Sequence, residues 1–205
     1  MQGNPIAMKK GTIRAVIRNG LVALSVAITA PLWLLAKLSV FVGKEGPFVS
    51  CGQLISMIPG TAGVMLRRGY YIMTLHHMAW DCGIGFGTWF SHAPVRIERG
   101  VSIGANCTIG ICDIGRNTLV GSNVDILSGR KQHNYLDLVR DTLHEGEFTR
   151  VIIGQASWIG NSSVIMSDIG KRCVIGAGSV VVSPINEYSV AAGNPARTIR
   201  KLKLN

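Results

Sequence analysis

The sequence predicts an all-β domain, a parallel β-helix, that follows an apolar α-helical segment. Two observations predict this: a six-residue repeat of aliphatic residues after residue 96, and a long uncharged run in the first quarter of the chain. A period of six fits neither an α-helix nor an alternating strand. It is typical of a β-helix in which each hexad forms one flat side of a coil.

The hexad repeat extends from Ile97 to Val181. Its aliphatic positions are Ile97, Ile103, Ile109, Ile114, Val120, Ile126, Ile153, Ile159, Ile165, Ile169, Ile175 and Val181. Glycine usually follows the aliphatic residue directly, and a small residue lies four positions after the aliphatic residue. Three hexads close a coil of about 18 residues, so the repeat predicts about four coils, and Ile84 and Phe90 indicate a further one. We expect the aliphatic side chains to stack into internal ladders.

Charge and cysteine content narrow the class of protein. The net charge is +10, but the basic residues lie mainly at the two ends and in one loop, without interleaved aromatic residues. This distribution argues against a nucleic-acid partner. The five cysteines are odd in number and include no CxxC pair, so neither a disulfide framework nor a zinc ribbon is indicated. At the small hexad position we interpret Cys107 and Cys173 as compact apolar fillers.

The amino-terminal part, residues 1–82, is predicted to be helical and membrane-associated. Residues 21–36 carry no charge, and a weaker apolar run over residues 48–66 is broken at Pro59-Gly60. Two hypotheses remain open for these runs: an in-plane helix or membrane-dipping pair (residues 21–42 and 48–66), or helices buried against the coils or a neighbouring subunit. Residues 83–205 are predicted to form the coil domain with a carboxy-terminal cap.

The rhythm of the hexads is interrupted by a long insertion at residues 128–150. It contains His133 and His144 together with several arginines and carboxylates. A coil accommodates such an insertion only as a loop projecting from a corner, and long loops in compact domains are often functional.

Several motifs of the chain together resemble those of a known family. The hexads, the loop with a histidine near its start, the segment VIIGQASWIGNSSVIM and the ending VIGAGSVVVSPINEYSVAAGNPARTIRK resemble the hexapeptide-repeat acyltransferases. The resemblance is to the maltose, galactoside, xenobiotic and nodulation acetyltransferase group and to O-acetyltransferases of polysaccharide biosynthesis. It covers about residues 83–203. It implies a left-handed β-helix, a homotrimer with active sites between subunits, and acetyl-CoA as co-substrate without a metal.

The candidate catalytic residues lie in and around the inserted loop. Acyl transfer to a hydroxyl needs a base, and the resemblance assigns this role to His133. We expect Asp125 to orient its imidazole, with Asp113, Asp137 and Glu147 as alternatives. Three further residues are predicted to line the acceptor site: His92, Asn134 and His144.

The candidate cofactor residues lie near the end of the chain. The resemblance implies contacts with coenzyme A from Trp158, Gly176, Ala177, Ser183, Arg197, Arg200 and Lys201. Cationic groups of the tail suit the phosphates of the cofactor. A coil-surface tryptophan, ordinary small fillers and a solvated basic tail are the alternatives. Pro184 replaces the lysine expected after Ser183, which weakens that assignment.

The sequence thus predicts an acetyl-CoA-dependent O-acetyltransferase that modifies a sugar hydroxyl of a glycan or lipid-linked saccharide. We expect it at the cytoplasmic face of the inner membrane of a bacterium, because the activated acyl donor is cytosolic. The alternatives are a non-catalytic trimeric scaffold and a metalloenzyme similar to the γ-carbonic anhydrases. The latter needs three histidines around zinc, and no histidine falls within the hexads.

Overall fold

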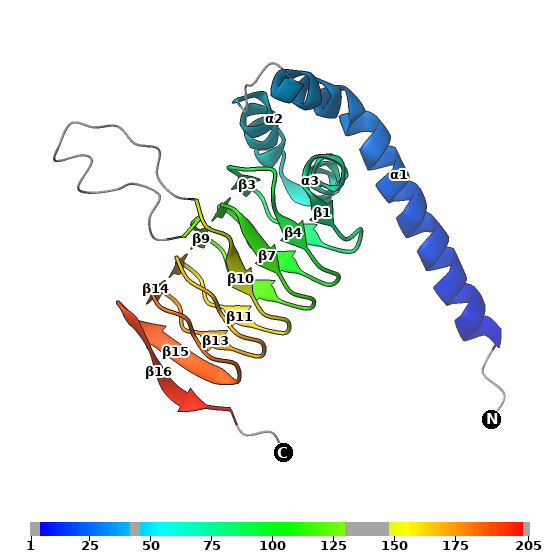
Figure 1. Cartoon of the computed structure of the whole chain (residues 1–205). Coiled ribbons are helices and arrows are strands. Elements are labelled where there is room, and N and C mark those ends of the chain that lie inside the picture. The colour runs from blue at the N-terminus through cyan, green and yellow to red at the C-terminus, as the bar shows by residue number, and fades with distance from the viewer. Residues whose placement is uncertain (1–4, 42–45, 130–147, 203–205) are drawn as a thin grey trace.

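The computed structural model describes residues 5–41, 46–129 and 148–202, with side chains from residue 19 onward except 39–41. Its first part consists of the helices α1 (Pro5–Phe41), α2 (Gly46–Ser56) and α3 (Gly60–Thr74). The break between α2 and α3 lies at Pro59-Gly60, where the sequence interrupts its second apolar run. Within α1, residues Asn19–Leu38 have a mean hydropathy of 1.9 and are long enough to cross a bilayer. At one end of the molecule α2 and α3 lie against the first coil, and α1 packs on α3 and α2 from outside (Figure 1).

The remainder is a parallel β-helix, as predicted. Short strands follow one another around three flat sides, and each side forms one sheet. Sheet A has the order β1-β4-β7-β10, sheet B the order β16-β15-β13-β11-β8-β5-β2, and sheet C the order β14-β12-β9-β6-β3. The strands are β1 (His77–Met78), β2 (Gly83–Ile84), β3 (Trp89–Phe90), β4 (Arg96–Ile97), β5 (Ser102–Ile103), β6 (Thr108–Ile109), β7 (Cys112–Ile114), β8 (Leu119–Val120), β9 (Asp125–Ile126), β10 (Val151–Ile153), β11 (Trp158–Ile159), β12 (Val164–Ile165), β13 (Val174–Ile175), β14 (Val180–Val181), β15 (Ser189–Gly193) and β16 (Ala196–Lys201).

The aliphatic hexad residues form the expected internal ladders. On sheet B the parallel register aligns Ile84, Ile103, Val120, Ile159 and Ile175, and each of these side chains is buried. The residue before each aliphatic points outward, because successive side chains of a strand alternate between its faces. The hexad therefore separates an apolar interior from three outer faces on which functional groups can be placed.

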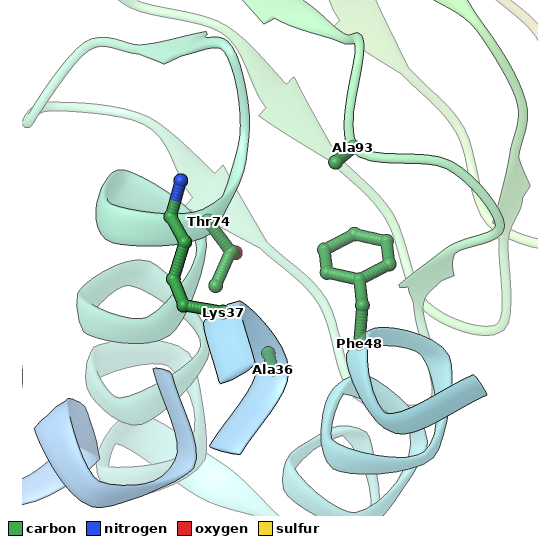
Figure 2. A pocket seen from close by; sticks show the side chains of 5 residues that line it. All are labelled: Ala36, Lys37, Phe48, Thr74 and Ala93. Carbon is green, nitrogen blue, oxygen red and sulfur yellow. The ribbon is translucent and has the colours of Figure 1, made fainter. Parts of the chain in front are cut away.

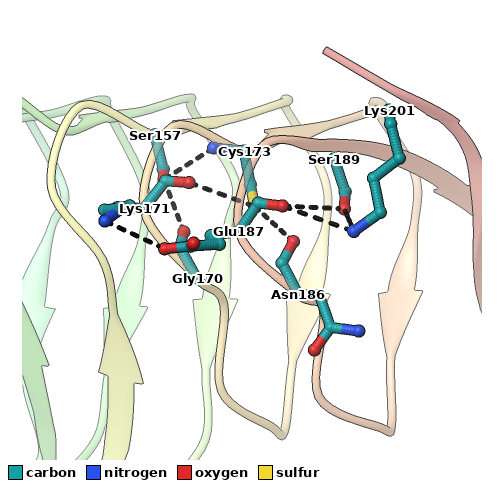
Figure 3. Close-up of polar contacts among 8 residues, drawn as sticks. All are labelled: Ser157, Gly170, Lys171, Cys173, Asn186, Glu187, Ser189 and Lys201. Atoms are coloured by element: carbon teal, nitrogen blue, oxygen red, sulfur yellow. Dashed lines mark hydrogen bonds and ion pairs between the residues drawn. The ribbon is translucent and has the colours of Figure 1, made fainter. Parts of the chain in front are cut away.

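The small residue of each hexad also forms hydrogen bonds between coils. The Ser157 hydroxyl donates to the Gly170 carbonyl at 2.9 Å, and the Thr118 hydroxyl donates to the Gly154 carbonyl at 3.1 Å. Figure 3 shows the same arrangement for Cys173, whose thiol lies 3.1 Å from the Asn186 carbonyl. The interpretation of the hexad cysteines as apolar fillers is thus incomplete, because their thiols occupy the donor position of the hydroxyls.

A buried arginine fastens the helices to the coils. The Arg67 side chain of α3 is fully buried. Its guanidinium donates to the carbonyls of Ser56 and Ile58, at 3.2 and 2.8 Å, and to the Ile84 carbonyl in β2 at 2.9 Å. The Ser56 carbonyl lies at the end of α2, where the backbone has no intrahelical partner, and it also accepts from the Gly87 amide at 2.8 Å. Arg67 thus joins α2, α3 and the first coil at one point.

The helices α1 and α3 cross closely at Gly69. A Cβ atom added there would lie 2.6 Å from the Ser25 carbonyl carbon and oxygen of α1. A methyl group therefore forces the two helices apart. We expect Gly69→Ala to lower the free energy of unfolding by about 1–3 kcal/mol, as overpacking does elsewhere. Urea unfolding followed by circular dichroism measures this.

Gly20 provides the matched control, because a Cβ atom at this helical position of α1 meets nothing within 4 Å. Alanine there is expected to stabilise the helix by about 0.5–1 kcal/mol. Equal effects of the two alanine substitutions would contradict the close crossing.

Candidate active site

The two ends of the inserted segment meet at the corner between sheets C and A, which we call the loop corner. The chain leaves β9 through Ser128 and Gly129 and returns at Thr149 before β10. The Thr149 amide donates to the Ser128 carbonyl at 2.9 Å, and the Ser128 hydroxyl accepts from the Ile111 amide at 2.8 Å. Gly129 has a φ of +84°, which glycine adopts without strain. The base of the insertion is therefore tied to the coils on both sides.

His92 lies at the same corner, in the first coil. Its ring centroid is 5.0 Å from that of Phe148, at the returning end of the insertion. The Ser91 hydroxyl is 2.9 Å from His92 Nδ1, and among the described residues no hydrogen bond to the other ring nitrogen is present. The predicted acceptor residue His92 thus lies beside the inserted segment, although 56 residues separate it from Phe148 in the sequence.

Several predicted residues lie outside the described part of the chain. They are His133, Asn134 and His144, with the alternative carboxylates Asp137 and Glu147. Their assignments stay predictions. The described ends of the segment, Gly129 and Phe148, both lie at the loop corner and thus place its attachment.

The two described carboxylate candidates differ in their surroundings. Asp125 is the outward residue of β9, half-buried between Thr108 and Val164 on sheet C. Asp113, on sheet A, forms an ion pair with Arg150 at the returning end of the insertion. Asp113 is thus paired with the returning end of the insertion, whereas Asp125 points outward on the strand that leads into it.

The predicted cofactor residues of the coils lie in three places. Trp158 is the outward residue of β11 on sheet B and is 55% exposed. Gly176 and Ala177 follow β13 at the corner between sheets B and C, whereas Ser183 follows β14 and lies at the loop corner of the last coil. In a three-sided coil the loop corner is opposite sheet B. Trp158 and the loop corner therefore cannot meet within one chain.

Pairing along sheet B connects Trp158 with the basic tail. Trp158 pairs with Val174, Val174 with Val190, and Val190 with Arg200 of the antiparallel strand β16. Paired residues point to the same side of a sheet, so the indole and the Arg200 guanidinium share the outer face of sheet B. Three strand spacings separate them, about 14 Å.

The other tail cations divide according to the same register. Arg197 pairs with the half-buried Ala192 and is exposed, whereas Lys201 pairs with the buried Ser189. The Lys201 ammonium donates to the Ser189 hydroxyl at 3.0 Å and to the Glu187 carbonyl at 3.4 Å (Figure 3). Lys201 thus binds the last coil.

The absence of a side chain at Gly176 also has a structural reason, because a Cβ atom there would lie 2.9 Å from that of Ala192.

The cysteines are poorly placed for nucleophilic catalysis. All five are buried and free of disulfides. Burial raises the pKa of each thiol, to about 11 for Cys82, so little thiolate forms near neutral pH. The described cysteines are therefore unsuited to act as nucleophiles. Residues 19–38, 46–129 and 148–202 include no group of three His, Cys, Asp or Glu side chains suited to a metal ion.

A small cavity lies between the helices and the loop corner. Phe48 and Ala93 line one side, and Ala36, Lys37 and Thr74 line the other (Figure 2). Its volume is about 120 Å³, and its walls are mostly apolar. Ala93 directly follows His92, so the cavity extends the surface beside the candidate acceptor residue.

The comparison with known families identifies the repeat. Residues 94–128 and 150–183 match the family model described as the hexapeptide repeat of succinyl-transferase. The coils are built of hexapeptide repeats. The match is interrupted at the insertion, in agreement with the loop corner described above.

Two curated relatives are similar over much of the hexapeptide-repeat domain. The galactoside O-acetyltransferase of Escherichia coli is 36% identical over 124 residues, which cover 56% of this chain and 58% of the relative. The Escherichia coli protein named "Putative lipopolysaccharide biosynthesis O-acetyl transferase" is 34% identical over 129 residues, 57% of this chain and 62% of the relative. The chain thus spans about three fifths of the length of these relatives.

A solved structure supports the fold over a larger share of the chain. A maltose O-acetyltransferase from Clostridium difficile superposes with a TM-score of 0.69 at 22% identity. The match covers 82% of this chain and 91% of that protein. At this identity the likeness shows the fold alone.

Sequence reasoning missed two residues of the loop corner, Ser128 and Phe148. Ser128 carried a signal, because it directly follows the last hexad strand before the insertion, and a hydroxyl there can bind a neighbouring coil. Phe148 carried none, since its contact with His92 joins two distant segments.

Proposed function

We propose that the protein is an acetyl-CoA-dependent O-acetyltransferase that modifies a hydroxyl of a sugar in a glycan or lipid-linked saccharide. The observation that carries the proposal is the hexapeptide-repeat coil interrupted by a histidine-bearing segment at the loop corner. Both curated relatives bear the name of an O-acetyltransferase, for a galactoside in one and for lipopolysaccharide biosynthesis in the other. A galactoside acetyltransferase with the same fold, at a TM-score of 0.65, was solved in complex with coenzyme A.

The proposed reaction is direct transfer. The His133 imidazole accepts the proton of the sugar hydroxyl while the hydroxyl oxygen attacks the thioester carbonyl carbon. The new carbon–oxygen bond forms, the carbon–sulfur bond breaks, and the imidazolium returns the proton to the coenzyme A thiolate. Donors such as backbone amides stabilise the oxyanion. This scheme needs no acyl-cysteine, in accord with the burial of the cysteines.

A homotrimer with the active site between subunits accounts for the distribution of the predicted residues. Within one chain, the loop corner and the Trp158 face of sheet B lie on opposite sides of the coil. A neighbouring copy can bring its sheet B to the loop corner of the first. The catalytic histidine and the cofactor face then come from two subunits.

The function is tested by following release of coenzyme A from acetyl-CoA with galactosides, maltose and lipid-linked saccharides as acceptors. Mass spectrometry of the acceptor then identifies an added acetyl ester. Acceptor-dependent release together with an ester on a sugar hydroxyl is the expected result. If calorimetry detects no binding of coenzyme A and no saccharide is acetylated, the scaffold hypothesis is favoured instead.

The tail cations give a sharper test of the cofactor face. We expect Arg200→Ala to raise the KM for acetyl-CoA about 5–20-fold with a smaller change in kcat, because a charge-assisted contact to phosphate is lost. Lys201→Ala is the matched control, since Lys201 binds Ser189 and the Glu187 carbonyl. It should lower the melting temperature and leave this KM nearly unchanged. A larger KM effect for Lys201 than for Arg200 would contradict the assignment.

A further inference from the structure

Helix α1 buries its polar side chains and exposes its apolar ones, which is the reverse of the usual arrangement in a folded protein. Between Leu21 and Ala36 its polar side chains, Ser25 and Thr29, are buried. Their hydroxyls donate to the carbonyls of Val22 and Ser25 within the helix. The exposed side chains of the same stretch are all apolar, and we call them the apolar face: Leu21, Ala23, Leu24, Ala27, Ile28, Pro31, Leu34 and Leu35.

The apolar face is continuous and large. Leu24 and Ile28 are each 56% exposed, and Leu35 is 52% exposed. A contiguous apolar surface of this kind marks a site of contact with a membrane or another protein. In Figure 1 α1 is the outermost element on its side of the molecule, so the coils do not cover this face.

Charge distribution favours a lipid partner. Residues 1–80 contain eight lysines and arginines and one acidic residue, Glu45, so seven of the ten net positive charges lie here. Basic residues next to an apolar helix face are typical of helices that bind anionic bilayers. A second copy of the chain carries the same positive charge, which opposes pairing through this surface.

The packing of α1 indicates how it meets the bilayer. Its apolar stretch is centred near Ile28, and Ser25 lies against Gly69 of α3. In turn α3 is fastened to the first coil by Arg67. The centre of α1 therefore cannot lie at the bilayer midplane unless α3 and the coil, with their polar groups, enter too, which is costly.

A groove between α1 and α3 adds to the apolar face. Leu21, Leu24 and Ile28 form one side, and Ala62, Met65 and Leu66 form the other. Its volume is about 190 Å³. Acyl chains of a lipid match this lining.

We propose that α1 lies in the plane of an anionic bilayer, with its apolar face among the acyl chains and the coils outside the membrane. This anchor is independent of the proposed reaction. It places the helical end of the coil stack at the lipid surface and the hairpin β15–β16 at the far end.

Vesicle sedimentation of the full chain tests the anchor. The protein is expected to sediment with vesicles of phosphatidylglycerol and phosphatidylcholine, and less with phosphatidylcholine alone or at high salt. The double variant Leu24→Gln/Ile28→Gln should lose at least about tenfold in apparent affinity, because two aliphatic side chains leave the lipid. Ile152→Gln, at a similarly exposed position on sheet A, is the matched control and should sediment like the original protein.

Several outcomes would overturn the proposal. Protein that stays in the supernatant, or a double variant that sediments like the control, would overturn membrane binding. So would a double variant that dissociates an oligomer in light scattering, since a second copy would then cover the face. Circular dichroism shows whether the double variant is folded, and the milder Leu35→Ser gives a smaller decrease in the same direction.

The depth of α1 has its own readout. Trp33 lies within the apolar stretch and is half-buried. The fluorescence that Trp33→Phe removes should be quenched more by lipids brominated near the headgroup than by lipids brominated near the chain end. The reverse order would indicate a spanning helix and overturn the in-plane arrangement. Neither measurement requires acetyl transfer, so a failed anchor is distinguishable from a failed enzyme assignment.

Discussion

Replacing His133 by alanine is expected to lower kcat for acetyl transfer by about 10²–10⁴-fold, the usual contribution of a general base. Binding of acetyl-CoA should persist, because the residues predicted to contact the cofactor, such as Trp158 and Arg200, are unchanged. Turnover is measured by release of coenzyme A, and binding by calorimetry. His133→Asn should be equally inactive, since an amide does not take up the proton.

Two further histidines test the specificity of this result. His77, exposed on β1, serves as the control, and His77→Ala should retain turnover. His144→Ala separates the two histidines of the insertion. Loss of turnover in His144→Ala together with near-normal turnover in His133→Ala would transfer the base assignment to His144.

Replacing Arg67 by methionine is expected to lower the free energy of unfolding by about 3–5 kcal/mol. The guanidinium donates to four carbonyls, those of Ile55, Ser56 and Ile84, which are buried, and that of Ile58, which is partly buried. Methionine fills a similar volume but removes this donor. The Ser56 and Ile55 carbonyls still accept from the Gly87 and Ile58 amides, whereas those of Ile58 and Ile84 lose the Arg67 bond. Each unsatisfied buried group costs about 1–3 kcal/mol before relaxation. Burial lowers the pKa of this guanidinium. The carbonyls oppose this effect, because they solvate the charged form.

Arg68 is the matched control, because it is the next residue of the same helix. It is half-buried and donates to a single carbonyl, that of Cys82, at 2.8 Å. Arg68→Met should cost only about 1 kcal/mol. Urea unfolding of both variants gives the comparison, and equal stabilities would refute the fastening role of Arg67.

The coil was predictable because its determinants are local. Each aliphatic hexad residue points inward on a two-residue strand, and parallel register then aligns Ile84 with Ile103 and Ile103 with Val120. The break at Pro59-Gly60 was visible for the same reason, since proline and glycine act on their own backbone. These features need no knowledge of distant contacts.

The site was harder to predict because it depends on which side of the coil each hexad occupies. The resemblance assigns Trp158 and the inserted segment to one active site. Within one chain, however, Trp158 and the loop corner lie on opposite sides of the coil. Counting hexads in threes would have shown this: Ile126 belongs to sheet C, Ile153 to sheet A and Ile159 to sheet B. The burial of Arg67 had no such signal, since a charge beside an apolar run usually marks its end.

The hairpin β15–β16 has a consequence for solubility. A stack of parallel strands ends in unpaired amides and carbonyls, which can recruit another chain and grow into a filament. Here β16 runs antiparallel to β15, with a register shift between Val190 and Ala191, and presents arginines at the margin of the sheet. Irregular pairing and charge both discourage addition of a further strand. β16 thereby protects the outer edge of sheet B from pairing with a strand of another molecule.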